Sequence, residues 1–169
     1  MKRVLVIGSP GAGKSTLSVE VARRTGLPLI HLDQHAWLPG WIELDREEWK
    51  AKLRQLVAGD RWVIDGNYGG SLGYRLTRAD TVIDLDLPMP LCVARLAKRI
   101  ISTHGRVRAD MADGCPEQLD WGFLLYTARF PWTHRARINE RLAAFQGRVI
   151  RLNSPAEVRR FLASLPSDG

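Results

Sequence analysis

The chain has 169 residues, a formal net charge of +7 and a sequence pI of about 10.0. Hydrophobic residues make up 45% of it and charged residues 25%, which fits one globular domain and excludes a disordered or membrane-embedded chain. Only Val4 to Ile7 are continuously apolar near the start, so we expect neither a signal peptide nor a membrane span. Cys92 and Cys115 match no zinc-ligand spacing, and we therefore expect reduced thiols in a cytoplasmic protein.

The excess of basic residues is compatible with two kinds of partner. Dispersed Lys and Arg neutralise the phosphates of a nucleic acid. Arginines also gather around a small polyphosphate in an enzyme. The basic residues are spread along the chain without a low-complexity tail. Composition therefore leaves both partners open.

Short apolar runs alternate with helical patterns along the chain. Apolar runs predict strands over 3–7, 29–32, 62–64, 81–87 and 148–152. Apolar residues at helical spacing predict helices over 14–25, 46–57, 93–100, 121–130, 136–146 and 155–165. This alternation predicts a single α/β domain with a parallel sheet covered on both faces. Ligands bind such sheets at the carboxyl ends of the strands.

Directly after the first predicted strand, the sequence matches the complete P-loop (Walker A) pattern. Its residues are Gly8, Ser9, Pro10, Gly11, Ala12, Gly13, Lys14 and Ser15, followed by Thr16. The glycines let backbone N–H groups point at phosphate oxygens, and the helix that follows adds its positive dipole end. Lys14 supplies a cation for the β- and γ-phosphates, and the Ser15 hydroxyl can ligate Mg²⁺. No asparagine is followed by lysine, so the Asn-Lys-x-Asp guanine motif is missing and ATP is favoured over GTP.

Carboxylates lie at the ends of the predicted strands. Asp33 follows the second strand, Asp65 follows the third, and Asp84 and Asp86 lie in the fourth. A P-loop enzyme needs a carboxylate near Mg²⁺, and a kinase also profits from one that orients the acceptor hydroxyl. We expect Ser15 and Asp65 to organise Mg²⁺ and Asp33 to orient the acceptor. A cap or turn is the alternative role for each carboxylate taken alone.

Two segments near these carboxylates are candidates for acceptor binding. Asp65, Gly66, Asn67 and Tyr68 form a compact polar turn after an apolar strand. In the segment 31–35, His31, Asp33 and His35 share one face if the chain is extended. Because no further metal ligands have a recognisable spacing, we favour an acceptor-binding edge over a zinc site.

Tryptophans also lie close to the second strand. Trp37 and Trp41 flank Pro39-Gly40 and are candidates for stacking on the acceptor. Trp49 and Trp62 fit a helix stripe and a strand, so we expect them in the core.

The region from His104 to Pro116 is rich in Gly, Asp and Arg and predicts an exposed, mobile loop. We expect it to form a lid over 104–117, and we expect Arg99 of the preceding helix to close over the transferred phosphoryl group together with Arg106 and Arg108. For Arg129, Arg135 and Arg137 we favour a solvated helix face.

With these motifs, the sequence resembles the adenylate-kinase-like branch of P-loop kinases. Within that branch it is similar to the DNA topology modulation proteins (FlaR-related). The matching stretches are His31-Leu32-Asp33, Trp37 with Pro39-Gly40-Trp41, Trp62 to Tyr68, Leu85 to Pro88 and Arg108 to Glu117. The resemblance implies a P-loop NTPase three-layer sandwich with sheet order 2-3-1-4-5, a lid insertion, ATP and Mg²⁺. Nucleotide kinases continue the Asp-Gly turn with Phe-Pro-Arg, where this chain has Asn67-Tyr68-Gly69. A hydroxylated metabolite, as in the shikimate and gluconate kinases that share the fold, is therefore equally open as acceptor.

The sequence therefore predicts an ATP-dependent phosphotransferase, monomeric or homodimeric, acting on a small nucleotide or a hydroxylated metabolite. The alternative is a nucleic-acid-binding ATPase that affects DNA topology, which the basic charge and the resemblance support. Against it, the chain has no helix-turn-helix, zinc-finger or RNA-recognition pattern. A nucleotide sensor with vestigial catalysis is a third interpretation.

Overall fold

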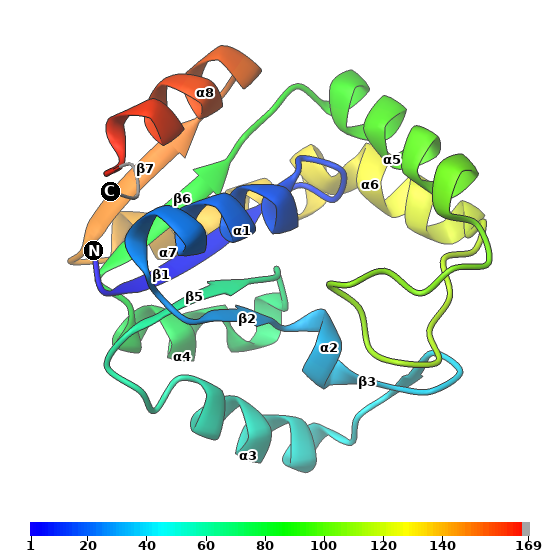
Figure 1. Ribbon diagram of the computed structural model, residues 1–169, viewed down its shortest axis with the longest axis horizontal. Helices are drawn as coiled ribbons and strands as arrows, with labels where there is room; N and C mark the ends of the chain where they lie inside the picture. The colour runs from blue at the N-terminus through cyan, green and yellow to red at the C-terminus, as the bar shows by residue number, and fades with distance from the viewer. Residues whose placement is uncertain (167–169) are drawn as a thin grey trace.

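The computed structural model describes residues 1–166. Its centre is a five-stranded sheet in which every neighbouring pair is parallel (Figure 1). The strands are β1 (Arg3–Gly8), β2 (Leu29–His31), β5 (Trp62–Asp65), β6 (Thr81–Leu85) and β7 (Arg148–Leu152). They lie in the order β2-β5-β1-β6-β7. Counted along the chain within this sheet alone, that order is 2-3-1-4-5, and the predicted fold class is confirmed.

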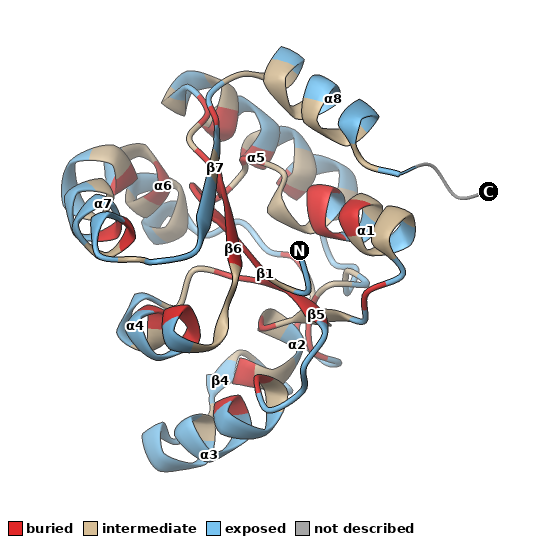
Figure 2. Ribbon diagram, turned by 90° about the vertical axis from the view of Figure 1, so that its left-hand side faces the viewer, coloured by how far each residue is buried: buried red, intermediate tan, exposed pale blue. Residues whose placement is uncertain are grey.

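Helices cover both faces of the sheet (Figure 2). One face is covered by α1 (Lys14–Thr25), α5 (Met89–Thr103) and α8 (Pro155–Ser164). The other face is covered by α3 (Arg46–Leu56), α4 (Gly69–Arg78), α6 (Trp121–Thr133) and α7 (Arg135–Ala143).

The central strand β1 shows why the apolar runs predicted strands correctly. Val4 and Val6 pack into the core on the α1 side, and Leu5 and Ile7 pack into the core on the α4 side. All four are at most 1% exposed. A strand covered on both faces needs a continuous apolar run, and successive side chains point to opposite faces.

Two of the predicted helices begin with side-chain caps. The Asp45 carboxylate accepts from the Glu47 N–H at the start of α3. At α8, Ser154 Oγ accepts from the Glu157 N–H while the Glu157 carboxylate accepts from the Asn153 N–H. These bonds satisfy first-turn donors that the helices cannot satisfy internally.

The segment 31–35 is not extended, so that prediction is wrong. Strand β2 ends at His31, and a short helix α2 (Asp33–Ala36) follows, in which the N–H groups of His35 and Ala36 donate to Leu32 O. A hairpin of β3 (Trp37–Leu38) and β4 (Ile42–Glu43) comes next. The side chains of His31, Asp33 and His35 therefore share no strand face.

The prediction that 104–116 is exposed throughout is also wrong. Met111, Ala112 and Cys115 are buried and pack with Trp37 and Trp41 of the hairpin region. Trp41 Nε1 additionally donates to Pro116 O over 3.1 Å. Apolar side chains interspersed among polar ones thus anchor this segment, while Gly105 to Val107 remain exposed.

No helix in the described part of the chain combines the length and apolarity that a membrane crossing requires.

Candidate functional site

The P-loop joins β1 to α1 and has backbone angles that only glycine adopts readily. Gly8, Gly11 and Gly13 have φ angles of 142°, 75° and 93°. A Cβ atom would lie 2.3 Å from Leu85 O at Gly8 and 2.2 Å from Cys92 O at Gly11. The first turn of α1 has no side-chain cap, so its N–H groups face the loop. Such a helix start is suited to an anion.

Lys14 lies at the centre of this loop. Its Nζ atom donates to the carbonyl oxygens of Gly8 and Ser9, each over 3.1 Å. Burial lowers the pKa of Lys14, and the negative charges of Asp33 and Asp65 act against that shift. Tertiary structure therefore places both predicted carboxylates close enough to interact electrostatically with the P-loop lysine.

Asp65 is the last residue of β5, and its two carboxylate oxygens lie in different environments. Oδ1 lies 2.8 Å from His31 Nδ1. Burial alone would lower the pKa of His31, but the hydrogen bond and charge of Asp65 raise it above the ordinary value. Oδ2 is buried and has no hydrogen-bond partner among the described residues.

This second Asp65 oxygen fits a cation. Buried carboxylate oxygens are ordinarily hydrogen-bonded or bound to metal. No group of three or more His, Cys, Asp and Glu side chains in the described residues could hold a metal ion. Mg²⁺ commonly takes only one or two protein carboxylates and completes its shell with water and substrate phosphates. Ser15 and Asp65 are suited to that limited share of the ligands.

Asp33 is the first residue of α2, and its carboxylate is the end of a chain of hydrogen bonds that runs from Trp37 through Tyr68. The Tyr68 hydroxyl donates to Asp33 Oδ1 over 2.6 Å, and Trp37 Nε1 donates to the Tyr68 hydroxyl over 3.1 Å. Burial raises the pKa of Asp33, although the Tyr68 hydrogen bond and the charge of Lys14 oppose the shift. Burial and the neighbouring Asp33 also raise the pKa of Tyr68, so the phenol keeps its proton and remains a donor.

The predicted polar turn is held against the P-loop. Gly66 and Tyr68 have φ angles of 126° and 31°. Asn67 Oδ1 accepts from the Gly8 N–H over 3.2 Å. The strained turn therefore contacts the phosphate-binding loop directly.

Arg75, which was not predicted as a site residue, supports this turn through hydrogen bonds to its carbonyl oxygens. Its side chain is fully buried and donates to Gly66 O over 2.9 Å, to Tyr68 O over 3.2 Å, and also to Asn67 O. Burial lowers the pKa of Arg75 to about 10. The sequence did contain a signal for a buried arginine, because Arg75 lies on the same helical stripe as the apolar Leu72 and Leu76.

Helix α4 itself was not predicted. Gly69, Gly70 and Gly73 are poor helix formers, so local propensity conceals the helix. The buried Leu72 and Leu76 hold it against the sheet core.

A buried glutamate brings two of the three predicted lid arginines together. Glu117 Oε2 lies 3.1 Å from Arg99 Nε and 2.9 Å from Arg108 Nε. The Glu117 side chain is 6% exposed. Arg106 is exposed, and its side chain makes no hydrogen bond or ion pair with another described residue. The structure therefore groups Arg99 with Arg108 and leaves Arg106 outside the cluster.

Asp110 connects this cluster to the P-loop. Its carboxylate lies 3.1 Å from Arg108 Nη1. Burial opposes ionisation of Asp110, but the neighbouring Ser15 hydroxyl and the Arg108 charge lower its pKa overall. The segment 104–117 thus lies near the predicted metal ligand Ser15.

The prediction that Arg135 lies on a solvated face is wrong. Its side chain is 11% exposed and binds Asp84, with both carboxylate oxygens 2.9 Å from Nη1, and also binds Asp86. Arg151 Nε binds Asp84 from another side over 3.2 Å. Asp84 and Asp86 are therefore engaged in ion pairs, and Asp65 is the strand-end carboxylate with a free buried oxygen. Arg129 and Arg137 are exposed as expected.

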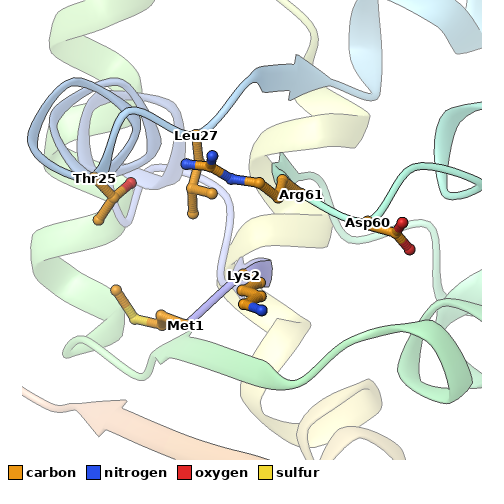
Figure 3. A pocket seen from close by; sticks show the side chains of 6 residues that line it. All are labelled: Met1, Lys2, Thr25, Leu27, Asp60 and Arg61. Carbon is orange, nitrogen blue, oxygen red and sulfur yellow. The ribbon is translucent and has the colours of Figure 1, made fainter.

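A pocket of about 460 Å³ lies at the amino ends of the strands, on the opposite edge of the sheet from the P-loop (Figure 3). Its lining is Met1, Lys2, Thr25, Leu27, Asp60 and Arg61.

A second pocket of about 510 Å³ lies between α3 and α4, and Tyr68 forms part of its wall. The complete lining is Arg46, Trp49, Lys50, Leu53, Arg54, Tyr68, Gly69, Gly70, Ser71 and Tyr74. Asp33 does not line this α3–α4 pocket, but Tyr68, which does, binds the Asp33 carboxylate through its hydroxyl.

Comparison with solved structures gives the same architecture. The chain is similar to a shikimate kinase from Acinetobacter baumannii in complex with shikimate, with a TM-score of 0.61 and 16% identity, over 96% of this chain and 91% of that chain. It is also similar to a shikimate kinase from Bacteroides thetaiotaomicron, with a TM-score of 0.52 and 18% identity, over 96% of this chain and 94% of that chain. The chain therefore has the fold of P-loop kinases. No protein-family model and no curated protein matches the sequence.

Proposed function

We propose that the chain is an ATP-dependent phosphotransferase that transfers the γ-phosphoryl group to a hydroxyl of a small acceptor. The acceptor is a small nucleotide or a hydroxylated metabolite. One observation carries this proposal: the P-loop lysine lies near two carboxylates, the half-buried Asp33 and the buried Asp65, whose charges act on its pKa. A phosphate-binding cation beside one carboxylate for the metal and one for the acceptor is the arrangement that phosphoryl transfer requires.

The phosphate side of the site is formed by the P-loop. The N–H groups of Gly11 and of residues 13–16 would bind the phosphates, and Lys14 would bind between the β- and γ-phosphates. Ser15 and the free oxygen of Asp65 would hold Mg²⁺, directly or through water. When bound, Mg²⁺ neutralises charge on the β- and γ-phosphate oxygens.

The acceptor side is formed by Asp33. Its carboxylate already accepts a hydrogen bond from a hydroxyl, that of Tyr68. An acceptor hydroxyl in the same place would be oriented for attack, and Asp33 would take its proton. The raised pKa of Asp33 makes it a better base than an ordinary aspartate.

Arg99 and Arg108 stabilise the negative charge that spreads over the transferred group. Glu117 holds both guanidinium groups in place. The segment 104–117 acts as the lid that excludes water, with the exposed Arg106 available on its outer part.

The solved structures described above support a small-molecule acceptor, because both are shikimate kinases and one contains shikimate. The resemblance to DNA topology modulation proteins and the net charge of +7 keep a nucleic-acid-dependent ATPase as the alternative outcome of the test.

The test is ATP consumption with Mg²⁺ across nucleosides, nucleoside monophosphates, sugar acids and duplex DNA, with products identified by mass spectrometry. We expect a phosphorylated small molecule. Lys14→Ala should reduce turnover at least about a hundredfold, since it removes a preorganised charge at the transferred phosphate. Lys52→Ala, an exposed change on α3, is the matched control. Hydrolysis that rises only with DNA and yields no phosphorylated small molecule would contradict the proposal.

A further inference from the structure

Helix α6 has an apolar stripe on the side that faces away from the core. Trp121, Leu125 and Trp132 are 74%, 51% and 73% exposed, and Ala128 lies between them on the same side. The opposite side of the helix contains Phe130, which is buried in the core. In Figure 2, α6 lies at the outer margin of the molecule beside α7. The outer stripe is therefore accessible to a partner.

The stripe has the size and chemistry of an interface centre. A tryptophan side chain contributes about 150–250 Å² when it is buried, so the exposed parts of Trp121 and Trp132 amount to roughly 300 Å². Each partner of a standard stable interface buries about 800 Å². The two tryptophans would supply a large part of that area, and tryptophan is enriched among the residues that dominate binding energy. An apolar patch of this kind marks an interaction site.

The spacing of the outer stripe is that of a coiled-coil seam. Steps of four, three and four residues separate its members, Trp121, Leu125, Ala128 and Trp132. Read backwards, the steps are the same and a tryptophan again lies at each end. In an antiparallel pair of α6 helices, Trp121 therefore lies beside Trp132 of the second copy. Leu125 lies beside the small Ala128 of that copy. A twofold-symmetric interface requires such a self-complementary surface.

The charges next to the stripe agree with this antiparallel pairing. Arg129 and Gly122 lie on the same flank of the stripe, and the pairing sets each opposite the other. A Cβ atom at Gly122 would lie 3.1 Å from Asp120 Oδ1, so this carboxylate adjoins the space that the glycine leaves open. Neither Arg129 nor Asp120 makes an ion pair with another described residue. Arg129 of each copy can therefore pair with Asp120 of the other.

We propose that two copies of this chain associate through the outer stripe of α6, as an antiparallel helix pair about a twofold axis. The tryptophans form both ends of the apolar contact, and the two pairs of Arg129 with Asp120 lie at its polar rim. Asp120 is three residues beyond Glu117, so the second copy contacts the chain directly after the segment 104–117. The inference does not depend on the phosphotransferase activity.

Size-exclusion chromatography with light scattering tests the association of the full chain. At about 10 µM the protein should elute with twice the 19.0 kDa mass of one chain, as expected for a dissociation constant of about 1 µM or below. Trp121→Gln/Trp132→Gln should raise this constant about a hundredfold or more, because it removes the apolar anchors. Val19→Gln, at an exposed apolar position of α1, is the matched control and should remain dimeric.

Charge variants test the antiparallel arrangement. Arg129→Glu should raise the dissociation constant about tenfold or more, since it sets a carboxylate beside Asp120 of the second copy at two places. Adding Asp120→Asn should recover most of this loss, because asparagine still caps α6 but does not repel the introduced carboxylate. Arg160→Glu, an exposed reversal on α8, makes the same change in net charge and should leave the dimer intact.

Three results would overturn the proposal. The first is the mass of a single chain at every concentration up to about 100 µM. The second is a dimer that the double tryptophan variant leaves intact, because the interface would then lie elsewhere. The third is a monomer that sediments with vesicles of anionic lipid and loses this binding in the double tryptophan variant, which would assign the stripe to a membrane surface. No recovery by Asp120→Asn would overturn the antiparallel arrangement.

Discussion

The Tyr68 hydroxyl donates a hydrogen bond to Asp33, with 2.6 Å between the phenolic oxygen and Oδ1. Trp37 Nε1 donates to the same hydroxyl over 3.1 Å and holds it in position. The proposed catalytic carboxylate therefore binds a hydroxyl of its own chain, in the position that an acceptor hydroxyl would take. Tyr68 influences both the protonation of Asp33 and access to it.

Tyr68→Phe should move the acid limb of the pH profile of kcat/KM to higher pH, because this profile reports the free enzyme, in which Tyr68 binds Asp33. The phenol stabilises the charged form of Asp33 and lowers its pKa, against the rise caused by burial. Its removal therefore raises that pKa further, and a base with a higher pKa loses activity at a higher pH as the solution is acidified. Trp49→Phe, which changes a neighbouring aromatic ring, is the control. An acid limb at the same pH in both variants and the parent would show that Asp33 is not the base.

Arg75→Met should destabilise the protein by about 2–4 kcal/mol, because it leaves buried carbonyls of the 66–68 turn without donors. Arg75→Lys should recover only part of the loss, since an ammonium cannot match the fork of the guanidinium. Urea unfolding measures both effects. Arg78→Met is the matched control, because Arg78 makes only long contacts of 3.4 and 3.3 Å to Val57 O and Ala58 O. Equal losses in Arg75→Met and Arg78→Met would refute the supporting role of Arg75.

Asp65→Asn and Asp84→Asn should affect different properties. Asp65→Asn should weaken the use of Mg²⁺, and Asp84→Asn should lower stability. Asp84 is fully buried between Arg135 and Arg151, so its neutralisation leaves buried cationic charge and should cost about 3 kcal/mol or more in urea unfolding. Asp65 has an oxygen with no partner among the described residues, so its neutralisation should raise the Mg²⁺ concentration needed for half-maximal turnover. If Asp65→Asn had a normal Mg²⁺ requirement and Asp84→Asn a raised one, Asp84 and not Asp65 would be the metal ligand.

Glu117→Gln should lower kcat about tenfold or more while changing the KM for ATP less. The loss of charge releases Arg99 and Arg108 from a shared partner, and small displacements of groups at a reacting centre are costly. Steady-state kinetics measures the change. Glu140→Gln, at an exposed position on α7, provides the comparison. An unaltered kcat in Glu117→Gln would mean that these arginines do not act in the transfer step.

Features that depend on neighbouring residues could be predicted from the sequence. The P-loop is one continuous segment, and its phosphate-binding geometry follows from glycines at fixed positions and from the helix start at Lys14. The predicted bounds of α1 and β7 agree with the structure for the same reason, because an apolar run or a helical stripe ends at local signals such as Gly26 and Gly147. The alternation of these elements was sufficient to predict a parallel sheet covered on both faces, whereas the sheet order came from the resemblance to P-loop kinases.

Contacts between distant parts of the chain were decided only by the tertiary structure. Arg135 and Asp84 are 51 positions apart, and nothing in the helical pattern around Arg135 distinguishes a buried ion pair from a solvated arginine. The burial of Arg75 required α4 to form despite three glycines, and the α3–α4 pocket required those two helices to approach each other. Long-range packing overrides local propensity because the free energy of burial is gained only when separate elements meet. The sequence alone therefore determined the phosphate-binding loop and the fold class, whereas the tertiary structure decided which charged side chains surround that loop and where pockets form.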